Sequence, residues 1–183
     1  AGVYLSGNGP LVQVLQDALR DGGGGGRTFV RAIKDYVGYY DARPAVSPPE
    51  HLLVFDEAQR AHDAERAAQV HKHAVNLSEP DKLLRFCNRV PRWNVLVALI
   101  GTGQAIFVGE EGGIPLWRKA VEDLPNASEW TVHCAGRLAK DFLGMPGQVV
   151  AADELNLDKE LRFHLASDID AMVDGLLADG AQD

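Results

Sequence analysis

The chain has 183 residues, of which 46% are hydrophobic, a length that favours one domain with a single core over two full domains. Its formal net charge of −8 disfavours a dedicated nucleic-acid-binding protein, unless the basic residues gather on one face. No apolar run approaches the roughly 20 residues that span a bilayer, and two cysteines without a C-x-x-C motif or a signal-peptide pattern predict a cytoplasmic protein.

The first part of the chain alternates short apolar runs with segments of helical period, which is typical of an α/β fold with a mostly parallel sheet. Residues 3–5 predict a strand, and Pro10 then opens a helix in which leucines recur at a spacing of four. Thr28 is expected to cap a second helix over residues 29–40. The next strand is expected at residues 52–55, after a segment rich in proline.

The later part of the chain continues the same alternation. Ser78 and Pro80 predict the start of a helix, and the near-continuous apolar run over residues 93–100 predicts a strand buried on both faces, at the centre of the sheet. The further elements expected are a helix over residues 114–122, strands near residues 130–133, 149 and 162–165, and a last helix over residues 169–177.

Five consecutive glycines, residues 22–26, interrupt this pattern. A run without side chains has nothing to pack and is costly to order, so it predicts a flexible tether with no element of its own. The alternative is a phosphate-binding loop, which needs a Lys and a Ser or Thr after the glycines. Here Arg27 and Thr28 follow in the wrong spacing. A natural low-complexity loop, or a linker introduced in place of a longer excursion, fits the run better.

Two adjacent carboxylates, Asp56 and Glu57, follow the strand expected at residues 52–55. In a nucleotide hydrolase, one carboxylate at a strand end holds Mg²⁺ and the next polarises the attacking water. The alternative is a helix N-terminus, where acidic residues interact favourably with the helix dipole and meet no metal. The residue pattern alone leaves both interpretations open.

Four stretches together carry a family resemblance: "LLVFDEAQRA" at residues 52–61, "VYLSGNGPLVQVL" at 3–15, "SEPDKLLRF" at 78–86 and "LIGTGQAIFVGEEGGIPLWRKAVE" at 99–122. In this order, and over roughly two thirds of the chain, they make coincidence improbable. The chain resembles the Schlafen group 3-like DNA/RNA helicase domain family, which comprises P-loop ATPases related to superfamily 1 helicases.

The resemblance implies a single RecA-like domain over residues 1–183, a P-loop NTPase-type three-layer sandwich, with Mg²⁺ and ATP as cofactors and DNA or RNA as partner. It makes Asp56 the acid associated with Mg²⁺ and Glu57 the acid that activates water. Gln59 and Arg60 would link the nucleotide site to moving neighbours, and Gln104 would sense the γ-phosphate. A neutral amide suits that last role because it can bond a phosphate oxygen and be released after hydrolysis.

The turn "SGNGP" lies where superfamily 1 proteins place a loop that contacts the nucleic-acid backbone, and Ser6 and Asn8 have suitable hydrogen-bonding groups. The alternative is a tight turn between a strand and a helix, with a Ser or Asn cap. The residues leave these two interpretations open.

The sequence also departs from the family pattern. No Gly-Lys-Ser or Gly-Lys-Thr occurs in the chain, residues 163–183 contain no Lys or Arg, and His62 stands where the family has a tryptophan. We therefore expect the middle of an ATPase core, inactive by itself, within a larger chain that carries the Walker A loop and the C-terminal helicase motifs. The alternative is a non-catalytic interaction or scaffold domain that kept the fold.

Overall fold

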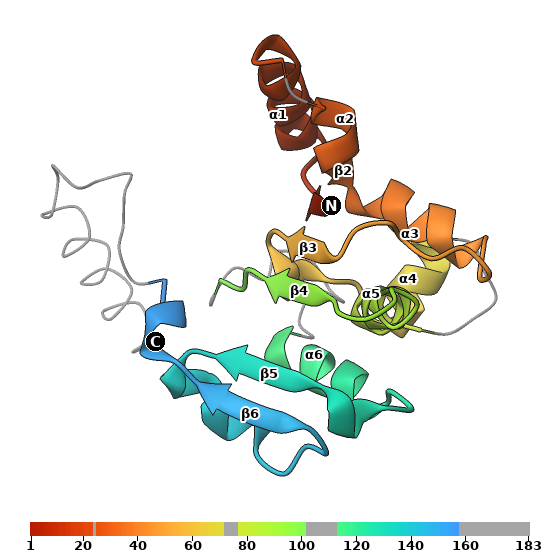
Figure 1. Ribbon diagram of the computed structural model, residues 1–183. Helices are drawn as coiled ribbons and strands as arrows, with labels where there is room; N and C mark the ends of the chain where they lie inside the picture. The colour runs from red at the N-terminus through yellow and green to blue at the C-terminus, as the bar shows by residue number, and fades with distance from the viewer. Residues whose placement is uncertain (24, 72–76, 102–112, 158–183) are drawn as a thin grey trace, which may run out of the picture.

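The computed structural model describes residues 1–23, 25–71, 77–101 and 113–157 (Figure 1). In these ranges strands alternate with helices, and every strand pair is parallel. One sheet has the strand order β2-β1-β3-β4, and a smaller sheet pairs β5 with β6. Helices lie on the sides of the larger sheet. The expected α/β fold with a mostly parallel sheet is confirmed, and it is consistent with a RecA-like sandwich.

The strands are β1 (Gly2–Ser6), β2 (Val30–Ala32), β3 (Leu52–Phe55), β4 (Val95–Ala98), β5 (Thr131–Cys134) and β6 (Gln148–Ala151). The α-helices are α1 (Gly9–Asp21), α2 (Gly26–Phe29), α3 (Ile33–Asp41), α4 (Ala64–His71), α5 (Glu79–Cys87) and α6 (Gly113–Glu122). Short 3₁₀ helices cover Ala58–Arg60, Ala127–Glu129, Gly136–Phe142 and Asp153–Leu155. The strand and helix expected at residues 162–165 and 169–177 lie outside the described residues.

The glycine run is more ordered than the sequence predicts. Gly22 is the C-terminal cap of α1, Gly25 precedes α2, and Gly26 is the first residue of α2 and is buried. A Cβ atom at Gly26 would overlap the carbonyl oxygen of Gln16 in α1. The prediction of a tether without any element is therefore wrong at Gly26, where a missing side chain lets two helices approach closely.

The prediction of one helix starting at Thr28 is also wrong for the residues before Ile33. Thr28 lies within α2, and the chain then forms the short strand β2 before α3 begins at Ile33. Pairing with β1, in which Val30 lies beside Tyr4, decides the conformation of these three residues. The helical spacing from Ile33 onward is correct, because Tyr36 and Tyr40 are buried on one face of α3.

Among the described strands, β4 lies at the edge of its sheet and not at the predicted centre. Strands β1 and β3 occupy the two central positions, and β4 pairs only with β3 among the described strands. The side chains of Val95 and Val97 are 46% and 36% exposed. An apolar run predicts that a strand can be buried, but it does not identify the neighbours that bury it.

Helix α5 begins as its sequence predicts. The Ser78 hydroxyl oxygen accepts a hydrogen bond from the Asp81 backbone N–H, and the Asp81 carboxylate accepts one in return from the Ser78 N–H. This capping box satisfies two backbone donors of the first turn, and Pro80 needs no partner there. The predicted helix over residues 114–122 and the strands near residues 130–133 and 149 are confirmed as well.

The two faces of the larger sheet differ in their covering. We define the inner face by the side chains of Val3, Leu5, Leu53, Phe55, Leu96 and Ala98, which pack against α3, α5 and α6. We define the outer face by the alternate side chains of Tyr4, Leu52, Val54, Val95 and Val97. Helix α1 lies at the β2 side of the sheet (Figure 1). None of the described helices is long and apolar enough to cross a membrane.

A second hydrophobic cluster lies between α6 and the smaller sheet, and it includes Leu124, Phe142 and Met145. Leu96 of β4 and Trp130 pack against both clusters. The two sheets therefore share a continuous core, although no described hydrogen-bonded strand pair joins them.

Candidate functional site at the carboxyl ends of the strands

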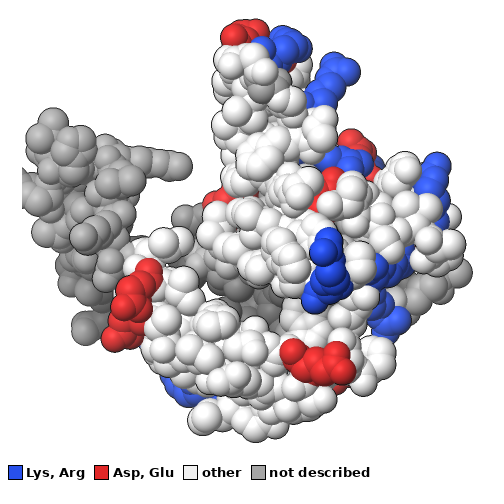
Figure 2. Space-filling model, viewed as in Figure 1, with Lys and Arg blue, Asp and Glu red and all other residues white. Residues whose placement is uncertain are grey.

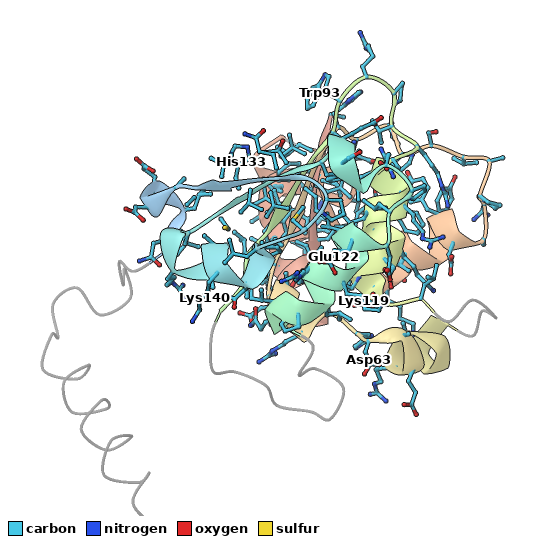
Figure 3. All side chains as sticks on the ribbon, turned by 90° about the horizontal axis from the view of Figure 1, so that it is seen from below. Asp63, Trp93, Lys119, Glu122, His133 and Lys140 are labelled. Atoms are coloured by element: carbon cyan, nitrogen blue, oxygen red, sulfur yellow. The ribbon has the colours of Figure 1, made fainter. Side chains whose placement is uncertain are left out.

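The stretch Asp56 to Arg60, called the DEAQR turn below, follows β3 at the carboxyl end of the parallel sheet. The Asp56 N–H donates to the Leu5 carbonyl oxygen at 2.9 Å, and the Ala58 N–H donates to the Leu99 carbonyl oxygen at 2.8 Å. These two bonds attach the turn to the strands on either side of β3. Figure 3 shows Asp63, just beyond the turn, and Trp93, just before β4, at opposite ends of the molecule.

Glu57 has a left-handed backbone conformation, with φ 54° and ψ 42°. For a residue with a side chain this conformation costs on the order of 1 to 3 kcal/mol, and it persists only where the surrounding structure imposes it. Here the backbone bonds of its neighbours impose it. The side chain of Glu57 is 43% exposed, so the strained turn presents a carboxylate to solvent at the end of a buried strand.

Gln59 connects this carboxylate to the end of β4. Its amide nitrogen donates to the Glu57 Oε2 atom at 2.7 Å, and its amide oxygen accepts from the Gly101 N–H at 3.0 Å. The Gln59 residue is only 8% exposed, so its amide is shielded from solvent even though both of its partners reach the surface. A change in the position of the segment after β4 would therefore be transmitted to the Glu57 carboxylate. Gln104, three residues after Gly101, lies outside the described residues.

Arg60 places a guanidinium group beside the same carboxylate. Its Nε atom lies 3.6 Å from Glu57 Oε2, which is too long for a hydrogen bond. That Nε atom is buried and has no hydrogen-bond acceptor within the described part of the chain. An unsatisfied cationic donor beside the Glu57 carboxylate is a group that a bound anion could satisfy.

Tyr4 of β1 contacts Asp56 from the neighbouring strand. Burial, followed by a side-chain hydrogen bond with Asp56, raises the pKa of Tyr4 well above its ordinary value. The neutral hydroxyl therefore serves as a donor that orients the Asp56 carboxylate. Sequence analysis did not identify Tyr4, although its place two residues before Ser6 on a predicted strand directs it to the same end of the sheet.

Trp117 of α6 supports the turn from the core side. Its indole N–H donates to the Ala58 carbonyl oxygen at 2.9 Å, and its ring lies 6.1 Å from that of Phe55, measured between ring centroids. Trp117 was quoted within a family-like stretch, but sequence analysis gave it no role. A buried indole needs an acceptor, and that requirement was the available signal.

His62, which replaces the family's tryptophan, ties the end of the turn to α5. Its backbone N–H donates to the Glu79 Oε2 atom at 3.0 Å, and its Nδ1 atom lies 3.2 Å from Glu79 Oε1. The Glu79 N–H donates in turn to the His62 carbonyl oxygen at 2.9 Å. His62 therefore connects the end of the DEAQR turn to the first residue of α5 through hydrogen bonds.

Ser6 and Asn8 shape the turn between β1 and α1. Ser6 is 1% exposed, and its Oγ atom accepts a hydrogen bond from the Asn8 N–H at 3.2 Å. The exposed Asn8 caps α1, because its Oδ1 atom accepts from the Leu11 N–H at 3.2 Å. The capping role is thus present, and contact with nucleic acid stays a prediction for both residues.

The donor set suits a hard cation that shares its ligands with phosphate. Among the described residues no group of three or more His, Cys, Asp or Glu side chains could enclose a metal ion. Mg²⁺, however, is usually held by one or two carboxylates together with waters and substrate phosphates. Asp56 and Glu57 offer such carboxylate oxygens, and the residues present therefore fit Mg²⁺ bound jointly with a nucleotide.

Comparison with known proteins gives one match. The sequence model of the family described as "Schlafen group 3, DNA/RNA helicase domain" matches residues 1–183. Searches of curated proteins and of solved structures returned no match. A match over the full length of the printed sequence, together with the parallel sheet and the acidic turn at its carboxyl end, places the chain in a family. The chain belongs to the Schlafen group 3 DNA/RNA helicase domain family.

Proposed function

We propose that this chain is the acid-bearing part of an ATPase core that hydrolyses ATP with Mg²⁺ and couples hydrolysis to the handling of DNA or RNA. The observation that carries the proposal is the bridge made by Gln59, which joins the Glu57 carboxylate to the Gly101 N–H at the end of β4. A bridge of this kind connects a reacting group to the end of a neighbouring strand, and a coupled ATPase requires such a connection between its catalytic group and the rest of the core.

The two carboxylates take different roles. Mg²⁺, when bound with ATP, supplies positive charge to the phosphates. Asp56, oriented by Tyr4, holds the ion, directly or through water. Glu57 accepts a proton from the attacking water at the oxygen that Gln59 leaves free, since Gln59 occupies Oε2.

Arg60 and Gln104 complete the phosphate environment in this proposal. The buried Nε atom of Arg60 finds an acceptor when an anion binds near Glu57. Gln104 follows the Gly101 contact by three residues and senses the γ-phosphate. Because Gly101 and Glu57 are bonded to the same amide, occupancy at Gln104 reaches the catalytic carboxylate through Gln59.

The nucleic-acid contact is proposed at the turn between β1 and α1. Asn8 is exposed there, and β1 is the immediate neighbour of β3. Ser6 is buried and therefore contributes by holding the turn, with Asn8 presenting the polar groups. DNA and RNA share the phosphodiester backbone that this turn would contact.

The test is the substitution Glu57→Gln in a parent ATPase that carries a Lys-containing phosphate loop. Removal of the general base should lower ATP turnover by about two orders of magnitude or more, while ATP affinity stays near normal. Turnover and calorimetric ATP titration are measured on the same preparation. The matched control is Glu65→Gln, an exposed acid on α4 beyond the turn.

Unchanged turnover in Glu57→Gln would refute its role as the base. Absence of ATP binding by the unmodified parent protein would favour the alternative, a non-catalytic interaction domain that kept the fold.

A further inference from the structure

Helix α6 connects the DEAQR turn to the part of the molecule that carries the smaller sheet. It contacts both the 3₁₀ helix Ala58–Arg60 and the 3₁₀ helix Gly136–Phe142. Its Trp117 side chain belongs to the core of the larger sheet, whereas Ala120 and Val121 belong to the second hydrophobic cluster. Figure 1 shows α6 beside β5. One helix therefore packs on both cores of the molecule.

The hydrogen bond of Trp117 reaches the strained part of the DEAQR turn. The indole N–H donates to the Ala58 carbonyl oxygen at 2.9 Å, and this bond is buried. The N–H of the same Ala58 donates to the carbonyl oxygen of Leu99, the residue that follows β4. The peptide groups on both sides of Ala58 are thus held, one from β4 and one from α6. The preceding residue, Glu57, has a left-handed backbone with φ 54°, which persists only while its neighbours are held in place.

The side chain of Arg118 attaches α6 to the segment before β6. Its Nη1 and Nη2 atoms donate to the carbonyl oxygens of Asp141 and Leu143, both at 2.9 Å, and its Nε atom donates to Glu122 at 2.8 Å. A planar guanidinium with three acceptors has a fixed orientation. Figure 3 labels Glu122 on α6 and Lys140 on the 3₁₀ helix that Arg118 joins to it. The position of α6 therefore depends on this segment.

Apolar packing provides much of the remaining contact between the two parts. Leu96 and Trp130 pack on both hydrophobic clusters, and Figure 2 shows few charged side chains between the part that carries β4 and the part that carries β5. Apolar contacts have no preferred direction, whereas a hydrogen bond depends on both distance and angle. The bonds of Trp117 and Arg118 therefore fix the position of α6 relative to the turn.

We propose that Trp117 is a positioning residue for Glu57, and that α6 transmits the arrangement of the smaller sheet to Glu57 through Arg118. This inference rests on the proposed function, in which the Glu57 carboxylate accepts a proton from the attacking water. With the indole bond in place, the carboxylate stays within reach of that water. Without the bond, the turn relaxes toward an unstrained conformation, which moves the carboxylate and slows hydrolysis without weakening ATP binding.

This contact differs from the bridge made by Gln59. Gln59 joins the side chain of Glu57 to the end of β4, whereas Trp117 holds the backbone that follows Glu57 from α6. The carboxylate is thus held through its own oxygen by one contact and through the main chain by the other. A shift of the smaller sheet reaches Glu57 by the second route, because Arg118 and Trp117 are neighbours on α6.

The test removes the indole N–H without changing the shape of the ring. In the parent ATPase in which Glu57→Gln is tested, Trp117 is replaced by 3-benzothienylalanine, which has sulfur in place of the N–H. ATP turnover should fall by about ten- to a hundredfold, while KM for ATP changes by less than about twofold. The matched control is the same replacement at Trp130, whose indole N–H donates to Asn88 Oδ1 at 3.2 Å, away from the turn. There turnover should stay within about twofold.

Combination with Glu57→Gln separates positioning from a general structural role. If Trp117 acts through Glu57, its replacement should lower turnover by less than about twofold in the Glu57→Gln background, because the group that it positions is gone. A residue that merely stabilises the fold would lower turnover by the same factor in both backgrounds. Equal factors would overturn the proposal. Unchanged turnover after replacement of Trp117, in a parent that Glu57→Gln inactivates, would overturn it as well and leave the proposed function intact.

The contribution of the smaller sheet is tested at two adjacent positions of α6. Arg118→Lys keeps the charge but loses the paired bonds to two carbonyl oxygens, so turnover should fall by about three- to tenfold with KM unchanged. The control is Lys119→Arg, because Lys119 is exposed and pairs with Asp123 on the same helix. Its turnover should match that of the parent. Equal turnover in the two variants would refute transmission through Arg118.

A measurement on the 183-residue chain separates this inference from the proposed function. The backbone ¹³C chemical shifts of Glu57, measured by NMR, report its φ and ψ angles. They should leave their left-handed values when Trp117 is replaced and stay unchanged when Trp130 is replaced. If Glu57→Gln leaves the turnover of the parent unchanged, the proposed function fails, and a change in the Glu57 shifts still supports the positioning contact. Unchanged Glu57 shifts would overturn that contact, whatever the turnover.

Discussion

The two faces of the larger sheet carry similar aliphatic residues, but those of the inner face are buried and those of the outer face are partly exposed. Val3, Leu5 and Leu53 on the inner face are at most 1% exposed, whereas Val95 and Val97 on the outer face are 46% and 36% exposed. All five are aliphatic residues in parallel strands. The difference therefore comes from what covers each face, and it shows that apolar composition marks a face as able to pack without naming its partner.

The covered face is also the one that supports the acidic turn. Trp117, from the inner layer, holds the Ala58 carbonyl oxygen, and Phe55 anchors the strand that leads to Asp56. On the other face Tyr4 contacts Asp56, where covering is incomplete. The DEAQR turn is therefore held mainly by contacts on the inner face of the sheet.

Substitutions on the two faces test this contrast with the largest expected effect. Leu53→Ala removes a fully buried side chain and should lower the free energy of unfolding by about 4 kcal/mol, because it leaves a cavity among packed neighbours. Val97→Ala should cost less than about 1 kcal/mol. Both values come from chemical denaturation. Equal losses would mean that the two faces are packed alike in solution.

The ion pair between α3 and α5 tests what holds together two of the helices that cover the inner face. The Lys82 Nζ atom lies 2.8 Å from Asp41 Oδ2, and the lysine side chain is 1% exposed. Asp41→Ala would leave a buried ammonium without a partner and should cost about 3 kcal/mol of unfolding free energy. The double variant Asp41→Leu with Lys82→Met should recover most of that loss. A double variant as unstable as the single one would contradict the assignment to charge burial.

The substitution Trp117→Phe tests how strongly helix α6 holds the DEAQR turn. An aromatic ring is retained, but the larger indole and its hydrogen bond to the Ala58 carbonyl oxygen are lost, so the free energy of unfolding should fall by about 1 kcal/mol or more. The Ala58 N–H, which donates to Leu99, should also exchange faster. Unchanged exchange at Ala58 would show that the backbone bonds alone hold the turn. Trp93→Phe, at an exposed position, is the control.

The smallest effect at neutral pH concerns Cys87 in the inner core. Burial raises the pKa of its thiol from 9.0 to about 12. Between about pH 9 and pH 12 the unfolded chain ionises this thiol more readily than the folded chain, so stability should fall as the pH rises. Denaturation at pH 7 and pH 10 should show a smaller loss in Cys87→Ala than in the parent chain. Identical pH dependence in both would contradict the role of this thiol.

Local signals predicted the elements that depend on local chemistry. Asn8 and Ser78 cap helices as their sequence context indicates, and the strand leading to Asp56 is in place. The errors arose where tertiary contacts decide. Val30 joins a strand through pairing with β1, and β4 lies at an edge because its apolar side chains have only one neighbouring strand among those described.

The two acidic residues of the site could be predicted from the sequence, whereas the contacts that position them could not be predicted as well. Asp56 and Glu57 follow a recognisable strand, but the left-handed conformation of Glu57 has no signal in the residue type, since such a turn usually takes glycine. The Tyr4 contact and the Trp117 bond join residues 52 and 59 positions apart along the chain, and no local pattern records them.

The close approach of α1 and α2 at Gly26 has a consequence for how the glycine run tolerates variation. The experiment is a library that randomises residues 22–26, followed by selection for folded protein and deep sequencing. Gly26 should be retained most strictly, because any Cβ atom there meets the Gln16 carbonyl oxygen. Gly22, whose backbone has an ordinary negative φ, should accept many residues. The glycines at these positions would then separate into a strict packing constraint at Gly26, a backbone preference for glycine at Gly23, whose φ is 78°, and a permissive site at Gly22.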